Sequence, residues 1–374
     1  MRIVFWQNCM SPHQIPYIVH LLDDERVDEV VLVAGETVSG ARKAMGWNVI
    51  EFQGLDRCKV YIRPHDQIIE SLLERRQADS YHLFSGIRAD EFVFQCLRKS
   101  LSYSLKRGII TERPNTYDFK RDIENARPYW LHRIRFFLQD RKYARHIQYV
   151  FAMGNEAVSY FQSLGQKWSV FPFCYCTASG AETNVPFQDD RLPQYLYCGS
   201  LSSWKSPLTI VRAISRMDVA ALGTVKMIGE GPLHRKLEKQ VKDLHLTEKV
   251  SLLGTKPQTE VPMYMRQSDI FILPSVYDGW GAVVNEALQA GCYVLCSDAC
   301  GASDLLKDNR LGKVFHHGDA QQLADCMTWC NRHIDEIRKD RCYRQEWAES
   351  HISGKVVARY MIDCLTGIKA RLYE

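Results

Sequence analysis

The feature that most constrains this chain is the stretch from Ser268 to Ala302. It opens with a short apolar run, Ile270–Leu273, whose length suits a buried strand. A loop with two glycines, Gly279 and Gly281, follows, and glycine lets backbone come close to a ligand. Residues 282–290 then read as a helix, and a second apolar run follows it. The pattern predicts a βαβ unit with a glycine-containing loop at the start of its helix.

Such a loop is a natural place for an anion, because backbone N–H groups at a helix N-terminus point at the ligand. Two carboxylates, Asp278 and Glu286, stand in this unit with seven residues between them, about two helical turns apart. Acids beside an anion fit best if they hold hydroxyl groups, which favours a polyol joined to a phosphate. For either acid alone, an ordinary helix start or a solvated helix residue is the better interpretation. The pair in this frame favours a site.

The stretch resembles the donor-site signature of retaining glycosyltransferases of family 4, which have the two-domain GT-B fold. Members usually carry two glutamates separated by seven residues, and here Asp278 replaces the first. The resemblance implies an α/β chain with two Rossmann-like domains facing a cleft. It also implies that Asp278 holds the hydroxyls of the donor sugar and that Glu286 holds the ribose hydroxyls. The backbone N–H groups of Gly279, Trp280 and Gly281 would bind the diphosphate.

The length of 374 residues favours two domains. Hydrophobic residues make up 46% and charged residues 25%, a globular composition, and a net charge of +4 is too small to indicate nucleic acid. Thirteen cysteines without a CxxC pair indicate a reduced, cytosolic chain without structural zinc. No signal peptide is expected at the N-terminus, and no apolar run approaches the ~20 residues of a membrane-spanning helix.

Short apolar runs predict the strands of the two domains. We expect strands at 2–6, 30–33, 48–52, 81–84, 108–110, 149–153, 170–172, 195–198, 225–228, 250–253, 270–273, 293–296 and 312–315. The domains are expected at 1–173, binding the acceptor, and at 191–351, binding the nucleotide sugar, with a small, polar linker at 174–190. The resemblance implies that a last helix, about 352–374, crosses back onto the first domain.

The second domain opens with a strand, Gly199, Ser200, and Lys205 six residues after the glycine. The family has Gly-Arg-Leu with a lysine at this spacing, so Ser200 replaces an arginine. A lysine before a helix is usually only solvated, but its place in the motif favours a role. Lys205 would stabilise the negative charge that develops on a diphosphate leaving group.

Two further loops complete the predicted donor site. Gly229 and Gly231 lie between a strand and a helix and resemble the family's second phosphate-side loop. Thr255 and Lys256 follow the strand whose end approaches the nucleotide base in the family, so backbone contacts are expected there.

Three residues of the first domain are candidates for the acceptor side of the cleft. His13 lies in the loop after the first strand and could contact diphosphate or acceptor, and a solvated loop histidine is an equal alternative. His82 matches a histidine that the family delivers to the cleft, although a core histidine is the better interpretation. Glu112 ends a strand, which suits acceptor binding or a base, and a surface salt bridge fits nearly as well.

Residues 120–145 combine cations with aromatic side chains. The cations are Lys120, Arg121, Arg127, Arg133, Arg135, Arg141, Lys142 and Arg145, and the aromatic residues are Tyr129, Trp130, Phe136, Phe137 and Tyr143. This composition suits the surface of an anionic membrane. Single-stranded nucleic acid could use it too, although we expect no nucleic-acid partner. A charged helix that packs its aromatic face on the core is the slightly favoured alternative.

The resemblance predicts a retaining hexosyltransferase-type glycosyltransferase (EC 2.4). It would move a sugar from a UDP- or GDP-sugar to a hydroxyl of a glycan or lipid-linked sugar, in bacterial surface polysaccharide or glycoconjugate synthesis. No cofactor and no metal are expected, because no Asp-x-Asp pair occurs. The expected location is cytoplasmic, with the inner face of the membrane as one option. The alternatives are an epimerase or phosphorylase on the same fold, or a non-catalytic partner subunit that binds nucleotide sugar.

Overall fold

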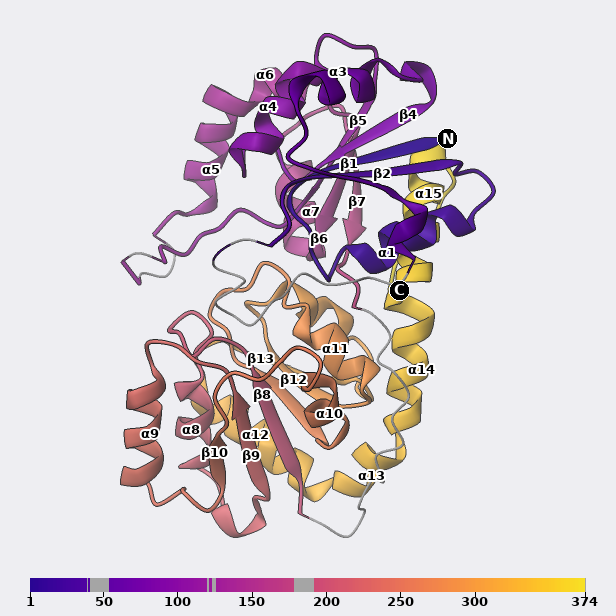
Figure 1. The fold of residues 1–374 in the computed structure, drawn as a ribbon. Helices are drawn as coiled ribbons and strands as arrows, with labels where there is room; N and C mark the ends of the chain where they lie inside the picture. The colour runs from indigo at the N-terminus through magenta and orange to yellow at the C-terminus, as the bar shows by residue number, and fades with distance from the viewer. Residues whose placement is uncertain (39, 41–53, 120, 123–125, 178–191, 374) are drawn as a thin grey trace.

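Two parallel β-sheets with flanking helices stack one above the other (Figure 1). The computed structural model describes residues 1–374 except 39, 41–53, 120, 123–125, 178–191 and 374. Every strand pair within the described residues is parallel. The chain therefore has the predicted α/β class with two Rossmann-like domains.

The described residues of the first domain form a sheet in the order β3-β2-β1-β4-β5-β6-β7. Its strands are β1 (Arg2–Cys9), β2 (Glu29–Glu36), β3 (Lys59–Ile62), β4 (Ser80–Phe84), β5 (Lys106–Thr111), β6 (Tyr149–Met153) and β7 (Ser169–Phe173). The central strand β1 is buried from Arg2 to Gln7, as expected for a parallel strand with both faces covered. Such burial on both faces explains its continuous apolar run.

The described residues of the second domain form a sheet in the order β10-β9-β8-β11-β12-β13. Its strands are β8 (Gln194–Cys198), β9 (Thr224–Ile228), β10 (Val250–Leu252), β11 (Ile270–Leu273), β12 (Tyr293–Ser297) and β13 (Gly312–Phe315). β11 lies between β8 and β12, where the chain order of the sheet reverses. Ligands of open α/β sheets bind at such a switch point, beyond the carboxyl ends of the strands.

The sequence predicts these strands well, with one omission. β6, β11 and β13 have the predicted bounds, and most of the others differ by one to three residues at an end. The strand expected at 48–52 lies outside the described residues. β3 was not predicted because it is an edge strand with mostly exposed side chains, and such a strand needs no apolar run.

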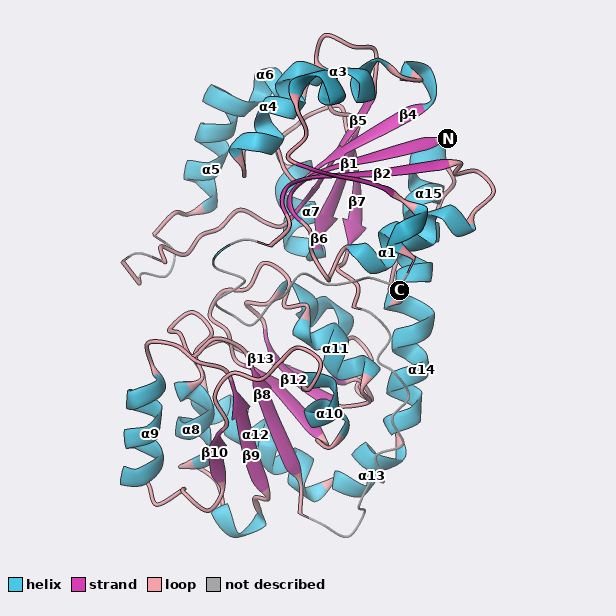
Figure 2. Cartoon of the chain, viewed as in Figure 1, coloured by secondary structure: helices cyan, strands magenta, loops and turns pink. Residues whose placement is uncertain are grey.

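Helices flank each sheet (Figure 2). Those of the first domain are α1 (Ile15–His20), α3 (Asp66–Glu74), α4 (Glu91–Ser100), α5 (Tyr129–Arg135), α6 (Arg141–Ala144) and α7 (Gly154–Gln162). Those that follow β8 are α8 (Leu208–Ile214), α9 (His234–Asp243), α10 (Val261–Arg266), α11 (Val283–Gln289), α12 (Ala320–Arg332), α13 (Ile334–Lys339), α14 (Arg341–Ile352) and α15 (Gly354–Thr366). None of the helices in the described part of the chain has the length and apolarity to cross a bilayer.

The last two helices connect the domains. α14 runs along the second domain, and α15 lies beside α1 of the first domain (Figure 1). Ser353 separates the two helices with an extended backbone and caps α15 by accepting a hydrogen bond from the Val356 N–H. Gly354 packs so closely on α1 that a Cβ there would lie 2.5 Å from the carbonyl oxygen of Pro16.

The start of the predicted linker is packed rather than solvated. Cys174 and Cys176 are fully buried, and the Cys176 N–H donates to the carbonyl of His13 over 3.0 Å. Both cysteines belong to one apolar cluster that continues from β1 of the first domain to Trp280 and α15. Residues 178–190 of the predicted linker lie outside the described residues.

The contact of α15 with α1 can be tested by adding one methyl group. We expect Gly354→Ala to lower the apparent free energy of unfolding by about 1–3 kcal/mol, because the new Cβ would overlap the backbone of Pro16. Urea denaturation followed by tryptophan fluorescence measures it. Lys355→Ala, at the neighbouring exposed position of α15, is the control and should change little. Equal midpoints for the two variants would contradict this packing.

Candidate active site

The predicted glycine loop lies at the carboxyl end of β11, where it meets the first domain. A Cβ at Gly279 would lie 1.8 Å from Oε2 of Glu112, which follows β5 of the first domain. Gly281 has a φ of +94°, a left-handed conformation that favours glycine. α11 begins two residues later, and the N–H groups of Val284 and Asn285 donate to the carbonyls of Gly281 and Ala282. The loop therefore presents a helix N-terminus beside a carboxylate of the other domain.

Lys205 and Asp278 form an ion pair at this loop, between Nζ and Oδ2. Both side chains are largely covered, with 23% and 14% of their surface exposed. Burial alone would lower the pKa of Lys205, but the charge of Asp278 outweighs it, so the pKa of Lys205 is raised. Glu112 is a further negative charge that raises this pKa. Lys205 is consequently a cation held between carboxylates of both domains.

Glu286 lies on α11, half-buried, on the side that faces β8. Burial raises the pKa of its carboxyl from 4.5 to about 7. It is the main charge acting on the thiol of Cys198, at the end of β8, whose pKa is raised to about 12 by burial and by this carboxylate. The two acids of the motif therefore have different surroundings. Asp278 is paired with Lys205, whereas burial is what acts on Glu286.

Glu112 and His13 come together through Tyr175. The Tyr175 hydroxyl donates to Oε1 of Glu112 over 3.0 Å, and the rings of His13 and Tyr175 have centroids 6.1 Å apart. These residues come from three separate strand ends of the first domain. The structure therefore places Glu112 next to Gly279, and His13 beside the tyrosine that binds Glu112.

His82 is a core residue, and its assignment to the cleft is wrong. Its side chain is fully buried within β4, where Nδ1 accepts a hydrogen bond from Nε1 of Trp6 over 3.1 Å and Nε2 lies 3.2 Å from Oγ of Ser80. Burial lowers the pKa of its imidazole to about 3, so the ring stays neutral. A histidine in mid-strand points into a layer of the domain and does not reach the end of the sheet.

Trp280 also has a structural side chain. The indole is 1% exposed, and its Nε1 donates to Oδ1 of Asn285 over 2.9 Å. Asn285 in turn donates to the carbonyl of Tyr175 over 2.9 Å. The Trp280 indole therefore cannot contact a donor, and only its backbone N–H remains a predicted ligand.

The glycines of the two remaining loops allow close contact between backbones. A Cβ at Gly229 would lie 1.9 Å from the carbonyl oxygen of Gly199, and one at Gly231 would lie 2.6 Å from that of Leu201. The N–H of Gly199 donates to Ile228, and that of Gly229 donates to Gly254. These two amides are engaged within the protein, so a direct role of Gly199 and Gly229 in binding phosphate is not supported. Their role is to pack the loops.

The other predicted donor-side residues remain at the ends of the strands. Oγ of Ser200 lies 2.9 Å from Oγ of Ser202, in the loop after β8. Thr255 is exposed just beyond β10, and Nζ of Lys256 lies 5.9 Å from the ring centroid of Tyr264. Lys256 thus lies beside an aromatic ring at the edge of the sheet.

Arg113 connects the domains, and it was not predicted. Its guanidinium pairs with Glu156, donates to the carbonyls of Asp278 and Ala299, and lies 4.9 Å from the ring centroid of Tyr277. These partners are up to 186 residues away in the chain, so no local pattern reveals them. The only signal was its place directly after Glu112.

A second contact supports the same arrangement. Oδ2 of Asp304, in the second domain, accepts a hydrogen bond of 2.6 Å from the N–H of Asn155. Asn155 is at the start of α7 in the first domain, where a carboxylate is favourable to the helix dipole. The domain contact therefore includes a carboxylate at a helix N-terminus.

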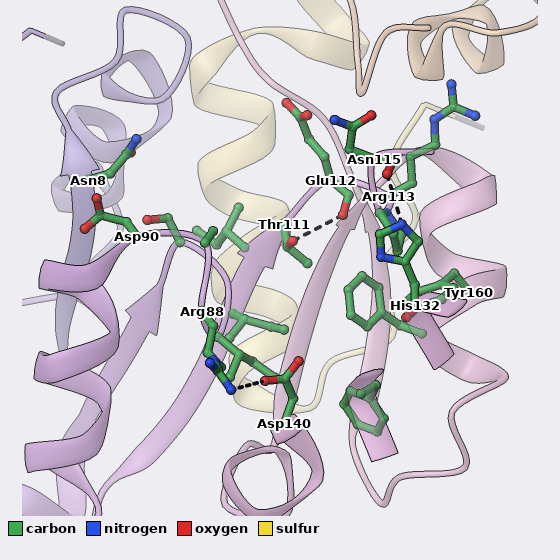
Figure 3. Close-up of a pocket in the computed structure, with 18 of the residues that line it drawn as sticks. Asn8, Arg88, Asp90, Thr111, Glu112, Arg113, Asn115, His132, Asp140 and Tyr160 are labelled. Carbon is green, nitrogen blue, oxygen red and sulfur yellow. Dashed lines mark hydrogen bonds and ion pairs between the residues drawn. The ribbon is translucent and has the colours of Figure 1, made fainter. Parts of the chain in front are cut away.

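A pocket of about 530 Å³ opens in the first domain beside Glu112 (Figure 3). Four arginines and one histidine line it together with three acids: Arg88, Arg113, Arg127, Arg135, His132, Asp90, Glu112 and Asp140. Nη1 of Arg88 lies 3.7 Å from Oδ1 of Asp140, and Nε2 of His132 lies 2.9 Å from the carbonyl oxygen of Asn115. Tyr277, of the second domain, lines the pocket too. The pocket and the glycine loop share Glu112.

One group among the described residues has the side chains for a metal ion. Asp298, His316 and His317 could each offer one ligand atom. In the structure their side chains bind one another, since Nδ1 of each histidine lies 2.7 Å from an oxygen of Asp298.

Comparisons with known proteins agree with this arrangement. Residues 181–349 match the family described as glycosyl transferases group 1. The amylovoran biosynthesis glycosyltransferase AmsK of Erwinia amylovora is 36% identical over 104 residues, 26% of each chain. A Campylobacter jejuni enzyme, N-acetylgalactosamine-N,N'-diacetylbacillosaminyl-diphospho-undecaprenol 4-alpha-N-acetylgalactosaminyltransferase, is 33% identical over 118 residues, 31% of each chain. The chain thus spans only about a quarter to a third of these relatives.

Solved structures match over nearly the whole chain. HepE of Anabaena in complex with UDP has a TM-score of 0.67 at 15% identity and covers 98% of this chain and 100% of its own. The lipopolysaccharide outer core galactosyltransferase WaaB has a TM-score of 0.67 at 13% identity, with 98% of both chains covered. Identities this low establish the fold alone, which is GT-B.

The contact between Gly279 and Glu112 predicts an energetic coupling between the domains. Gly279→Ala should lower the apparent free energy of unfolding by about 1 kcal/mol, because its Cβ would push the Glu112 carboxylate away from its hydrogen bond with Tyr175. In the Glu112→Ala background the same change should cost less than about 0.5 kcal/mol. A double-mutant cycle by urea denaturation measures the difference.

Gly318→Ala is the matched control for this cycle. A Cβ there meets no atom within 4 Å, so its cost should be the same with and without Glu112→Ala. An equal cost of Gly279→Ala in both backgrounds would show that Glu112 does not occupy this position.

Proposed function

We propose that this protein is a retaining, hexosyltransferase-type glycosyltransferase. The match of residues 181–349 to the glycosyl transferases group 1 family supports this assignment. It transfers a sugar from a nucleotide diphosphate sugar to an acceptor hydroxyl. The observation that carries the proposal is the convergence of Lys205, Asp278 and Glu112 on the glycine loop. A cation and a helix N-terminus suit a diphosphate, and the carboxylates suit sugar hydroxyls.

In the proposed reaction, the bond between the anomeric carbon and the diphosphate oxygen breaks, and its electron pair stays on the phosphate. Lys205 and the backbone N–H groups of Gly279, Trp280 and Gly281 stabilise the charge that develops there. The acceptor oxygen forms its bond on the same face of the sugar, and its proton passes to the leaving phosphate. Asp278 holds donor-sugar hydroxyls and Glu286 holds the ribose. This route uses no protein nucleophile.

The first domain would hold the acceptor in the pocket beside Glu112. Glu112 lies between this pocket and the glycine loop, so it is placed to position the attacking hydroxyl. The donor is proposed to be a UDP- or GDP-sugar, and the structures of HepE with UDP and with UDP-glucose support a uridine donor. AmsK, named for amylovoran biosynthesis, supports a role in polysaccharide or glycoconjugate synthesis.

We also propose that the reaction needs no metal and that the enzyme acts in the cytoplasm, at the inner face of a membrane. The sequence has no Asp-x-Asp pair, and Lys205 supplies a positive charge at the proposed diphosphate position. A glycan or lipid-linked sugar is the proposed acceptor. The Campylobacter relative aligns with this chain over 118 residues, and its printed name describes a lipid diphosphate acceptor.

The proposal is tested by incubating the purified chain with a panel of UDP- and GDP-sugars and candidate acceptors, and by identifying products by mass. We expect transfer with one donor, and we expect Lys205→Met to lower kcat on the order of 10²- to 10³-fold, the cost of one transition-state charge contact. Exposed Lys236→Met is the control. Epimerised donor would favour an epimerase, and binding without turnover would favour a non-catalytic partner subunit.

The raised pKa of Glu286 predicts a pH dependence of donor binding. Only the ionised carboxylate accepts hydrogen bonds from both ribose hydroxyls, and with a pKa of about 7 its ionised fraction falls about tenfold from about pH 8 to about pH 6. The Kd for the donor should therefore rise about tenfold across this range, measured by calorimetry. Glu286→Gln cannot titrate and should bind weakly with no such slope. The same slope in both proteins would contradict the role of Glu286.

A further inference from the structure

We propose that the outer face of the helical segment 129–144 is a docking surface for an anionic lipid bilayer. This segment joins α5, a π-helical turn (Phe136–Asp140) and α6. Five large apolar side chains within nine residues are exposed, and together they are named the docking face: Trp130 (59%), Leu131 (41%), Ile134 (47%), Phe137 (46%) and Leu138 (78%). A patch this dense indicates an interaction site, because scattered single residues are the norm on a soluble surface.

The docking face lies opposite the pocket. Trp130, Ile134 and Leu138 are spaced by four residues, so they follow one side of the helix. His132, Phe136 and Asp140 have the same spacing two residues out of phase, and all three line the pocket (Figure 3). Two residues turn an α-helix by about 200°. One helical segment therefore forms a wall of the pocket with one side and presents apolar side chains outward with the other.

The charges around the docking face have one sign. Four exposed cations flank it, namely Arg133, Arg141, Lys142 and Arg145. Residues 126–146 are all described by the structure, and Asp140 is the one acidic residue among them. Its side chain lies near Arg88, in the pocket. Basic residues near an anionic bilayer contribute about 1 kcal/mol each, and the apolar side chains insert at the boundary of headgroup and acyl chain. The pattern is complementary to anionic lipid.

The structure argues against the two other occupants of this surface. The aromatic side chains of this segment do not all pack on the core. Phe136 is buried, whereas Trp130 and Phe137 are exposed. A second copy docked through the same face would bring the four flanking cations of one chain against those of the other, which is unfavourable in a two-fold interface. Anionic lipid meets both the apolar and the cationic side chains.

Docking in this way would set the orientation of the first domain. α5 lies at the edge of that domain away from α1 and α15 (Figure 1), and the pocket is directly behind it. If the proposed function holds, a lipid-linked acceptor in the same bilayer would reach the pocket without leaving the membrane. The docking face would then select acceptors by their location.

Vesicle binding tests the docking face directly. We expect the purified chain to pellet with phosphatidylcholine vesicles that contain phosphatidylglycerol, and to stay in solution with pure phosphatidylcholine. Trp130→Gln with Leu138→Gln should lower the partition coefficient on the order of tenfold or more, since two apolar side chains no longer insert. Arg141→Glu with Lys142→Glu should lower it similarly, and raising the salt concentration should weaken binding of the unmodified chain.

A matched control separates the docking face from general hydrophobicity. Leu244→Gln with Ile368→Gln removes two exposed apolar side chains elsewhere, with 41% and 52% exposure, and should leave binding unchanged. Circular dichroism checks that all variants are folded. Equal binding to both vesicle types, or equal loss in the control pair, would overturn the proposal. A dimer by light scattering that Trp130→Gln with Leu138→Gln abolishes would instead show a second copy as partner. Neither measurement needs sugar transfer, so docking and transfer can fail separately.

Discussion

Glu112 and Arg113, two adjacent residues of the first domain, contact the glycine loop of the second domain and the backbone beside it. The arrangement of the site depends on this contact. Glu112 occupies the space that a side chain at residue 279 would need, and Arg113 binds backbone carbonyls next to that loop. Only 9% of the Arg113 side chain is exposed, and a buried guanidinium is tolerated when hydrogen bonds and a carboxylate surround it. Both domains must be folded and in contact before these partners exist. The site is therefore a property of the domain contact.

The electrostatics of the site follow from that contact. Carboxylates of both domains surround Lys205 and keep it protonated, so the cation is held in place before any ligand arrives. A diphosphate at the loop would compete with Asp278 for this cation, and the released carboxylate would be close enough to accept hydrogen bonds from the attached sugar. Glu286 differs because burial, without a cation as partner, favours its neutral form. One acid of the motif is thus paired with a cation, while burial acts on the other.

The helical segment 129–144 connects the pocket beside Glu112 with the molecular surface. Its inner side supplies His132 and Asp140 to the pocket, while its outer side carries the docking face. The π-helical turn at Phe136–Asp140 adds a residue to the turn, and both Phe137 and Leu138 are exposed there. Recognition of a surface and of an acceptor can therefore reside in one element.

The sequence by itself determined the order of the elements and the βαβ unit around the glycine loop, because apolar runs and glycines act locally. It also placed Asp278, Lys205 and Glu112 in segments that follow strands, where a parallel α/β sheet gathers its ligands, and Glu286 on the helix after the glycine loop. It could not settle which side chains face inward: His82 stayed a cleft candidate beside the favoured core interpretation, and the burial of the Trp280 indole was not predicted. Gly229 likewise needs its small size for the neighbouring loop. Only the tertiary structure decided the Lys205–Asp278 ion pair, the hydrogen bonds of Arg113 to the second domain and the exposure of the docking face. Each depends on how segments distant in the sequence pack against one another.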